Sequence, residues 1–187
     1  AQWVQPQGAF GLFPCRAVDE ETVAVYDPAD HKKELCTFDF TTVIGAGKED
    51  LVNASQYYPG LDAAVPGVIG IQLTTSGPQV DDIIEQFKAE GDSESSLYLQ
   101  GLSDRIAEDM AQYLHQEQRK LMGVDARQGQ RWSPGYPGMR NLINNETLFK
   151  RLDAGEKLGV SLTEANEFSP TGSTGAVLSF HPDARYT

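Results

Sequence analysis

The sequence predicts an α+β protein with an antiparallel sheet. Strand-like segments occur in clusters, helical segments follow in clusters of their own, and the regular strand-helix alternation typical of a parallel sheet is not found. The chain has 187 residues, of which 40% are hydrophobic, which is sufficient for one hydrophobic core. We therefore expect a single domain over residues 1–187. Because the first residue is Ala and not Met, this domain is expected to be a processed chain or a piece of a longer one.

The N-terminal part of the chain predicts a β-hairpin followed by further strands. Residues 8–18 and 21–27 are short, rich in Val, Phe and Leu, and separated by an acidic turn. Residues 35–40, "LCTFDF", alternate at a period of two, and residues 68–75, "VIGIQLTT", form a mostly apolar strand. These segments supply most of the expected sheet.

Three helices are expected after these strands. Pro78 suits the first turn of a helix over about 79–89, and the longest element runs from about 93 to 121. A shorter helix is expected at about 146–157, closed by Gly159.

The long helix has an apolar stripe that we expect to be buried. Its members recur every three or four residues, as one helical face requires, and are Leu99, Leu102, Ile106, Met110, and Tyr113 or Leu114. A different stripe carries the polar residues Asp104, Glu108 and Gln112. Downstream, residues 175–187 predict a strand, a turn at 181–183 and the start of a second strand.

Composition disfavours a nucleic-acid or membrane partner. Lys and Arg total 15 against 27 for Asp and Glu, which gives a net charge of -12, and nucleic-acid binding depends on neutralising phosphates. No apolar run approaches the roughly 18 residues of a membrane span. Without a signal peptide, and with two cysteines expected to be reduced and packed, the protein is expected to be cytoplasmic.

Common catalytic and metal-binding motifs are not present. Gly45-Ala-Gly47-Lys48 resembles a phosphate loop, but the first glycine of that motif and the Ser or Thr after the lysine are missing. The histidines His31, His115 and His181 do not have metal-ligand spacing, and we interpret His115 as a satisfied surface or half-buried imidazole. No catalytic residue or metal site is predicted.

The segment "RWSPGYPG", residues 131–138, is the strongest candidate for a binding site. Its prolines fix their own φ angles and favour extended conformations at Ser133 and Tyr136, so backbone groups are available to a ligand. Its glycines allow another molecule to approach closely, and Arg131 offers two parallel donors for a carboxylate. The alternative is an ordinary connector in which Trp132 and Tyr136 fill the core.

Four blocks of the sequence resemble the activation domain of cobalamin-dependent methionine synthase. They are the helix containing "SDRIAEDMAQYLHQEQRK", the "RWSPGYPG" loop, the "GVSLTEANEFSP" segment and the final "HPDARY". They occur in the family's order, and the opening "GAFGLFPCRAVDEETVAVYD" is similar to the family's first hairpin. The resemblance covers nearly the whole chain and implies a twisted antiparallel sheet with helices packed on it.

This resemblance implies a function in reactivating a cobalamin enzyme. The family binds S-adenosylmethionine and caps a cobalamin-binding domain. Flavodoxin or a similar reductase supplies an electron to cob(II)alamin, and S-adenosylmethionine then donates a methyl group. Alternatives are a free-standing S-adenosylmethionine-dependent methyltransferase that acts on another acceptor, and a module that docks on a partner without binding the ligand.

The resemblance also implies ligand-binding residues. Arg131 would pair with the ligand carboxylate, Glu108 would face its amino group, and the Ser133 backbone would contact its adenine end. Tyr136 would shape the loop, and Tyr186 would close the site. The family has an aspartate before the strand at 68–75, and Ser55 stands at about that place here.

Overall fold

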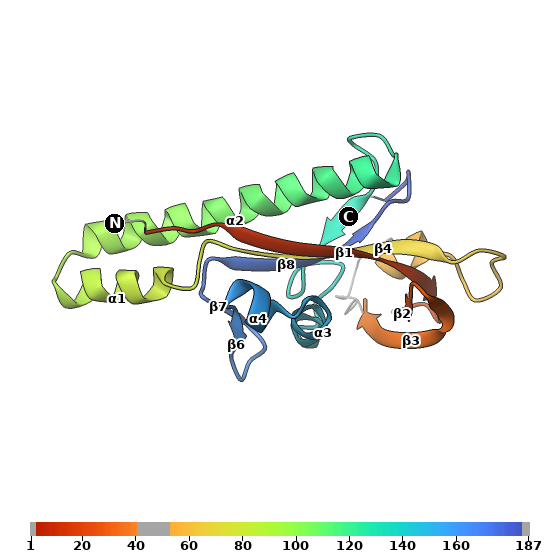
Figure 1. The fold of residues 1–187 in the computed structure, drawn as a ribbon, viewed down its shortest axis with the longest axis horizontal. Helices are drawn as coiled ribbons and strands as arrows, with labels where there is room; N and C mark the ends of the chain where they lie inside the picture. Colours follow the sequence, from red (N-terminus) through yellow and green to blue (C-terminus); the bar gives the residue numbers. More distant parts are fainter. Residues whose placement is uncertain (1–2, 41–52, 185–187) are drawn as a thin grey trace, which may run out of the picture.

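The computed structural model describes residues 3–40 and 53–184, and its centre is a six-stranded sheet (Figure 1). Every neighbouring pair of strands in this sheet is antiparallel. In spatial order the strands are β3 (Asp30–Asp39), β2 (Thr22–Asp27), β1 (Gln7–Ala17), β4 (Gly67–Thr75), β8 (Ser173–Ser179) and β5 (Gln130–Trp132). The predicted fold class and the N-terminal hairpin are confirmed, and β3 begins five residues before the predicted strand.

The central strands bury both faces of the sheet. Along β4, Ile69, Ile71 and Leu73 point to one face, where they are completely buried in the main hydrophobic core. The intervening Gln72 and Thr74 point to the other face and are also completely buried. Both faces of β4 are therefore buried, one by apolar side chains and the other partly by polar ones.

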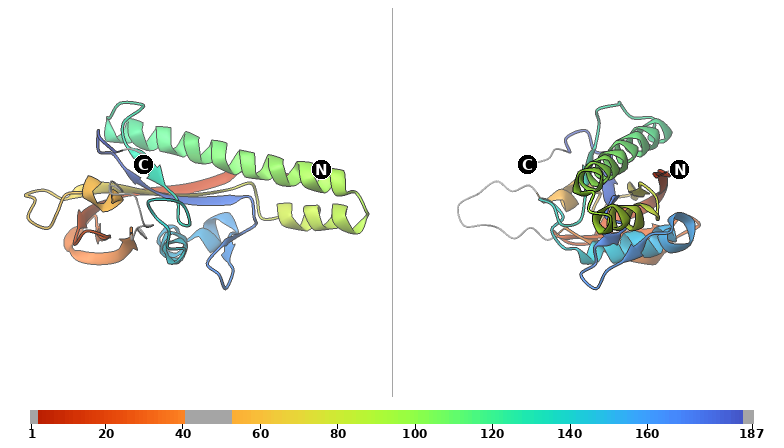
Figure 2. Two further views of the ribbon diagram at one scale, coloured as in Figure 1. Left: turned by 180° about the vertical axis from the view of Figure 1, so that it is seen from behind. Right: turned by 90° about the vertical axis from the view of Figure 1, so that its left-hand side faces the viewer.

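Helices cover the two faces of the sheet, as Figures 1 and 2 show. The long α2 (Ser93–Met122) lies across one face, while α3 (Ile143–Leu152) and α4 (Ala154–Leu158) lie on the other. The predicted extent of the helix at 146–157 was wrong. The chain forms two helices here, which are separated at Asp153, whose φ is 51°. The closing glycine, Gly159, is confirmed as a left-handed C-cap.

The helices α1 (Val80–Ala89) and α2 begin and end close to their predicted limits. Asp92 caps α2 by accepting a hydrogen bond from the backbone N–H of Ser95, and Gly123 ends the helix with φ of 66°. In Figure 1, α1 packs alongside the N-terminal part of α2, beyond the end of the sheet. These caps are local signals, which explains why the sequence predicted both limits.

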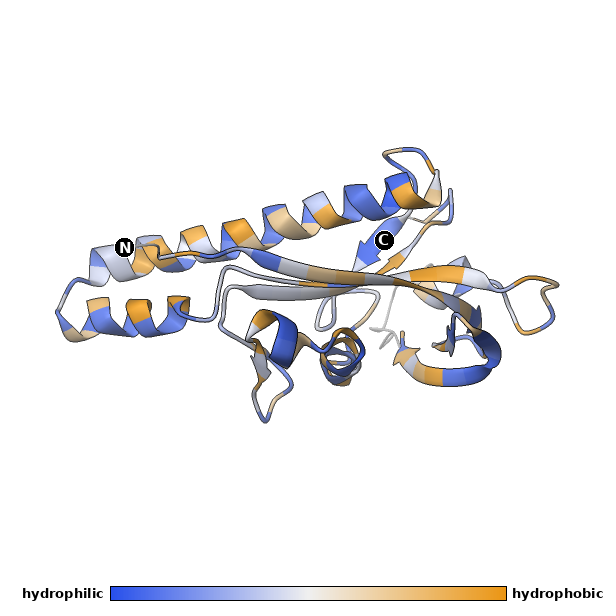
Figure 3. Ribbon diagram, in the orientation of Figure 1, coloured by the Kyte–Doolittle hydropathy of each residue, from blue (hydrophilic) through white to orange (hydrophobic). Residues whose placement is uncertain are grey.

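The buried face of α2 differs from the predicted one. Leu102 and Tyr113 are 51% and 55% exposed, whereas Ser103, Ala107 and Ala111 are buried against the sheet. Figure 3 shows that apolar residues recur along the whole length of this helix. The prediction that the whole apolar stripe is buried was therefore wrong, although Leu99 and Leu114 are buried.

Hydrogen bonds from the sheet explain why α2 buries small residues. The side chain of Thr74 donates to the carbonyl of Ala107 at 2.9 Å, and Gln72 donates to the carbonyl of Ala111, also at 2.9 Å. Gln72 in turn accepts from the Gln118 amide at 2.9 Å. Larger side chains at the two alanines would hold the helix too far from the sheet for these bonds.

The remaining elements are short. A 3-10 helix spans Ala54–Tyr57, and β6 (Ser161–Leu162) and β7 (Phe168–Ser169) form a separate two-stranded sheet.

Within residues 3–40 and 53–184, no helix combines the length and apolar character needed to span a membrane. Cys15 and Cys36 are both free, as predicted, and burial raises the pKa of the Cys36 thiol to about 11.

Candidate ligand-binding site

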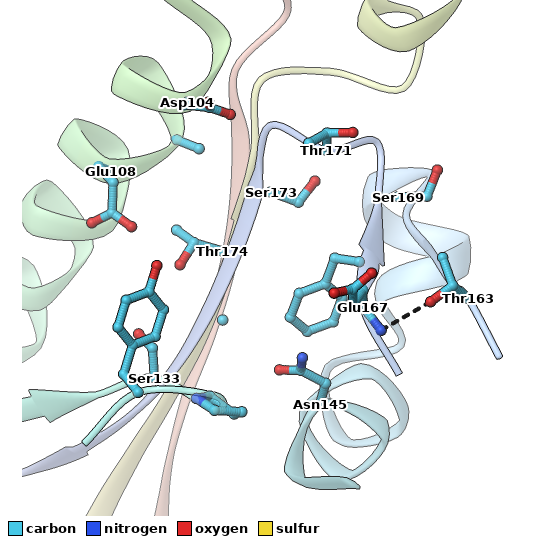
Figure 4. A pocket seen from close by; sticks show the side chains of 15 residues that line it. Asp104, Glu108, Ser133, Asn145, Thr163, Glu167, Ser169, Thr171, Ser173 and Thr174 are labelled. Atoms are coloured by element: carbon cyan, nitrogen blue, oxygen red, sulfur yellow. Dashed lines mark hydrogen bonds between the residues drawn. The ribbon is translucent and has the colours of Figure 1, made fainter. Parts of the chain in front are cut away.

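A cavity of about 630 Å³ lies beside the first half of β8. The short β5 pairs with β8 only at residues 177–179, so the edge of β8 at residues 173–176 is not covered by β5. Side chains from α2, the loop after β5, α3 and the β6–β7 hairpin surround this edge (Figure 4). The absence of a longer β5 therefore creates the opening.

The α2 wall of the cavity supplies two carboxylates. Asp104 and Glu108 lie four residues apart on one face of the helix, and both line the cavity together with Ala107. Burial, together with the negative charge of Asp81, raises the pKa of Asp104 above its usual value. This carboxylate is consequently in a site where a cation would stabilise its charged form.

The opposite wall is formed by α3 and the β6–β7 hairpin, and Figure 4 shows Asn145, Thr163 and Glu167 on this side. The amide of Asn145 donates to the carbonyl of Asn166 at 2.8 Å, which fixes the hairpin to α3. The hydroxyl of Thr163 accepts from the backbone N–H of Glu167 at 3.1 Å. These bonds hold a third carboxylate, that of Glu167, at the cavity.

The loop after β5 forms the third wall, through Ser133, Pro134 and Tyr136. It is a compact turn in which the N–H of Tyr136 donates to the carbonyl of Ser133 and the N–H of Gly135 donates to the carbonyl of Met139. The expected extended strip of free backbone groups is therefore only partly present. Tyr136 is 61% exposed and does not fill the core, whereas Trp132 is buried there.

Gly138 is required by the protein's own packing, so the expectation that it makes room for another molecule was wrong. Its φ is 88°, and a Cβ atom there would lie 2.7 Å from Cδ1 of Trp132. Close packing of the loop on the indole ring therefore explains the glycine.

An ion pair joins the two principal predicted residues. Nη2 of Arg131, on β5, donates to Oε2 of Glu108, on α2, at 2.7 Å. Nη1 of the same guanidinium is buried and has no hydrogen-bond partner within the described structure. Glu108 lines the cavity. Arg131 is not part of the lining, and its guanidinium contacts the lining through the Glu108 carboxylate.

The structure thus brings together four of the six predicted site residues: Glu108, Ser133 and Tyr136 line the cavity, and Arg131 adjoins it. Ser55 does not line it. This serine is 1% exposed, and its hydroxyl donates to the carbonyl of Glu20. Ser55 is therefore not part of this cavity, contrary to its expected grouping with Glu108 and Ser133. Tyr186 lies outside the described residues, as does the glycine-lysine segment at 45–48.

Sequence reasoning missed most of the polar lining. Asp104 shares a helical stripe with Glu108, so the four-residue spacing could have identified it. The other polar residues that were missed are Asn145, Thr163, Glu167, Ser169, Thr171, Ser173 and Thr174. Thr163, Glu167 and Ser169 lie in the "GVSLTEANEFSP" block, which was recognised without a site role, and the fold brings them beside α2 and α3.

The cavity lining is acidic. It contains Asp104, Glu108 and Glu167 and, among the residues that the structure describes, no Lys, Arg or His. Nor do the described residues contain a group of three or more His, Cys, Asp or Glu side chains that could hold a metal ion. The three carboxylates and the neighbouring hydroxyl and amide groups of the lining are suited to a ligand that carries positive charge and hydrogen-bonding groups.

Comparisons with known proteins agree with this architecture. A crystal structure of the MetH reactivation domain bound to AdoHcy superposes with a TM-score of 0.87 at 23% sequence identity. The match covers 100% of this chain and 62% of that chain, so the present sequence spans less than two thirds of the solved one. The family model for the activation domain of vitamin B12-dependent methionine synthase matches residues 1–187. The chain belongs to this family of activation domains.

Proposed function

We propose that the chain binds S-adenosylmethionine in the cavity beside β8 and serves as the activation module of a cobalamin-dependent methionine synthase. The observation that carries the proposal is the Arg131–Glu108 ion pair at the cavity. The solved relative contains S-adenosylhomocysteine, which is the demethylated form of this ligand. Both molecules carry an amino-acid group with one ammonium and one carboxylate.

The ion pair is complementary to that amino-acid group. A ligand carboxylate can take the place of the Glu108 carboxylate on the guanidinium, and the ligand ammonium can then pair with Glu108. This exchange replaces one ion pair by two and leaves no charge unpaired, which limits the desolvation cost of binding. Arg131 and Glu108 accordingly have the roles of carboxylate and ammonium receptors.

The charge and size of the cavity fit the rest of the ligand. A sulfonium centre carries a positive charge, and the lining has three carboxylates. The volume of about 630 Å³ is within the ordinary range for small-molecule sites. Ser133 and Tyr136 line this cavity. We assign the Ser133 backbone to the adenine end, Tyr136 to the shape of the loop, and Tyr186 to the closure of the site.

Cobalamin, carried by a partner domain or protein, supplies the metal-centred chemistry and accepts the methyl group. The present chain binds the methyl donor, orients it and covers the reaction from water, so we expect no activity from the isolated domain. Flavodoxin or a similar reductase is the proposed electron donor, and nucleic acid has no part in the proposal. The two free cysteines are consistent with the cytoplasm as the proposed location.

Calorimetric titration of residues 1–187 tests the proposal. S-Adenosylmethionine and S-adenosylhomocysteine should each bind once per chain. Methionine, which lacks the nucleoside, and adenosine, which lacks the amino-acid group, should bind far more weakly. If neither full ligand binds to the folded protein, the proposal is wrong. Equal binding of adenosine and S-adenosylmethionine would show that the Arg131–Glu108 pair is not the amino-acid receptor.

A further inference from the structure

His115 lies between two connections that hold β5 against α2. On this helix it follows Glu108 by seven residues and precedes Arg119 by four, so the three side chains share one face. Glu108 accepts from Arg131 in β5. Arg119 donates to the carbonyls of Gln128 and Gly129, immediately before β5, at 2.7 and 3.0 Å.

Besides Oε1 of Gln118, two buried polar atoms of α2 and β5 have no hydrogen-bond partner among the described residues. One is Nε2 of His115, whose side chain belongs to a residue only 3% exposed. The other is Nη1 of Arg131. A guanidinium nitrogen can only donate, whereas one nitrogen of a neutral imidazole accepts, so the two atoms have complementary requirements. A buried polar atom without a hydrogen-bond partner costs free energy. The presence of an unpaired donor and an unpaired acceptor on facing elements therefore indicates that they are connected.

Burial and the neighbouring positive charges keep the imidazole neutral. Burial, and then the positive charges of Arg119 on α2 and Arg131 on β5, lower the pKa of His115 to about 3. The nearby carboxylate of Glu108 is engaged by Arg131. At neutral pH His115 therefore retains a lone pair on one ring nitrogen.

We propose that His115 is a positioning residue for the carboxylate receptor, accepting a hydrogen bond from Nη1 of Arg131 through one ordered water. This contact holds one side of the guanidinium and leaves Nη2 and Nε for the carboxylate of a ligand. It fixes the orientation of the Arg131 guanidinium before the ligand binds, so less side-chain entropy is lost on binding. The inference rests on the proposed function, because its readout is the binding of S-adenosylmethionine.

Three substitutions of His115 separate positioning from simple packing. The amide of His115→Gln reaches the place of Nε2 and can accept a hydrogen bond, the shorter His115→Asn cannot reach it, and His115→Leu has no acceptor. We expect His115→Gln to bind S-adenosylmethionine within about twofold of the wild type. His115→Asn and His115→Leu should bind about tenfold more weakly, which corresponds to the loss of one hydrogen bond.

A double-mutant cycle tests the dependence on Arg131. In an Arg131→Ala background, His115→Leu should cause no further loss of affinity, because the group that it positions is absent. Affinity is measured by calorimetry, with the folded fraction of each variant determined from circular dichroism. If His115→Leu does not fold, the comparison of His115→Gln with His115→Asn decides the same question.

The outcomes separate this inference from the proposed function. If the wild type does not bind the ligand, the proposed function is wrong and the inference falls with it. If the wild type binds, Arg131→Ala binds weakly and all folded His115 variants bind normally, only the inference is overturned. It is also overturned if His115→Gln is as weak as His115→Asn, or if His115→Leu weakens binding equally in both backgrounds.

Discussion

Nη2 of Arg131 lies 2.7 Å from Oε2 of Glu108, although the two residues are 23 positions apart in the sequence. One belongs to the three-residue strand β5 and the other to the middle of the 30-residue helix α2. The pair joins the shortest strand of the sheet to the longest helix at the edge of the acidic cavity. The pair therefore links β5 to α2 where Glu108 lines the cavity.

Removal of the guanidinium should weaken ligand binding. We expect Arg131→Ala to lose about 1.5 to 3 kcal/mol of binding free energy for S-adenosylmethionine, the range for hydrogen bonds to charged groups. Arg131→Lys is the matched control, since it keeps the charge but has only one nitrogen, and it should recover part of the affinity. Titration curves identical to the wild type in folded Arg131→Ala would exclude Arg131 from the site.

Charge removal at Glu108 should produce a salt-dependent loss. Glu108→Gln retains the shape of the side chain but cannot form an ion pair with the ligand ammonium. We therefore expect the largest loss of affinity at low ionic strength, where this attraction is least screened, and a smaller loss at high salt. Affinities are measured over a salt series with Asp109→Asn, on the same helix but paired with Arg105, as control. Wild-type affinity of Glu108→Gln at every salt concentration would argue against the assigned role.

Substitutions of Ser133 and Pro134, in the loop that forms one wall of the cavity, should have different effects on ligand affinity. Ser133→Ala retains the backbone and should bind nearly as tightly as the wild type. Pro134→Gly increases the freedom of the loop in the unbound state, so it should weaken S-adenosylmethionine binding as well as lower the melting temperature. Both quantities are measured for both variants. Normal affinity per folded molecule in Pro134→Gly would indicate that the loop only completes the core.

The buried imidazole should make stability depend on pH. The pKa of His115 is about 3 in the folded protein and about 6.5 when unfolded, so the unfolded state binds more protons between these values. Stability should consequently fall as the pH decreases through 6.5. From pH 7.5 to 5.5 the wild type should lose about 1.4 kcal/mol more unfolding free energy than His115→Gln. Urea denaturation at both pH values measures this difference, and parallel losses in the two proteins would contradict it.

Two glycines should respond to alanine in opposite directions. Gly138→Ala places a Cβ atom 2.7 Å from Trp132 at a φ of 88°, so we expect a loss of at least about 1 kcal/mol of stability. Gly101 lies exposed in α2, where a Cβ atom would meet nothing within 4 Å in the described structure beyond its own helix, so Gly101→Ala should add about 0.5 to 1 kcal/mol. Chemical denaturation compares both variants with the wild type. Equal effects would show that the conformation of Gly138 is not required.

Local signals in the sequence determined most of the secondary structure. Asp92 and Gly123 define the limits of α2, and the apolar pattern at 68–75 identifies β4. The fold class followed from the clustering of strands and helices. The segment at 131–138 was also predicted to contribute to a site, and Ser133 and Tyr136 do line the cavity. These features depend on capping, periodicity and turn chemistry, which act over a few residues.

Only the tertiary structure decided which face of α2 is buried and where the cavity lies. Thr74 and Gln72 of β4 donate to carbonyls of α2, and this close approach favours the small residues Ala107 and Ala111 over the apolar stripe. The acidic lining likewise depends on β5 covering only part of β8 and on the β6–β7 hairpin lying across the cavity from α2. Periodicity identifies the apolar face of a helix, but the chemistry of the opposing surface determines which face is buried.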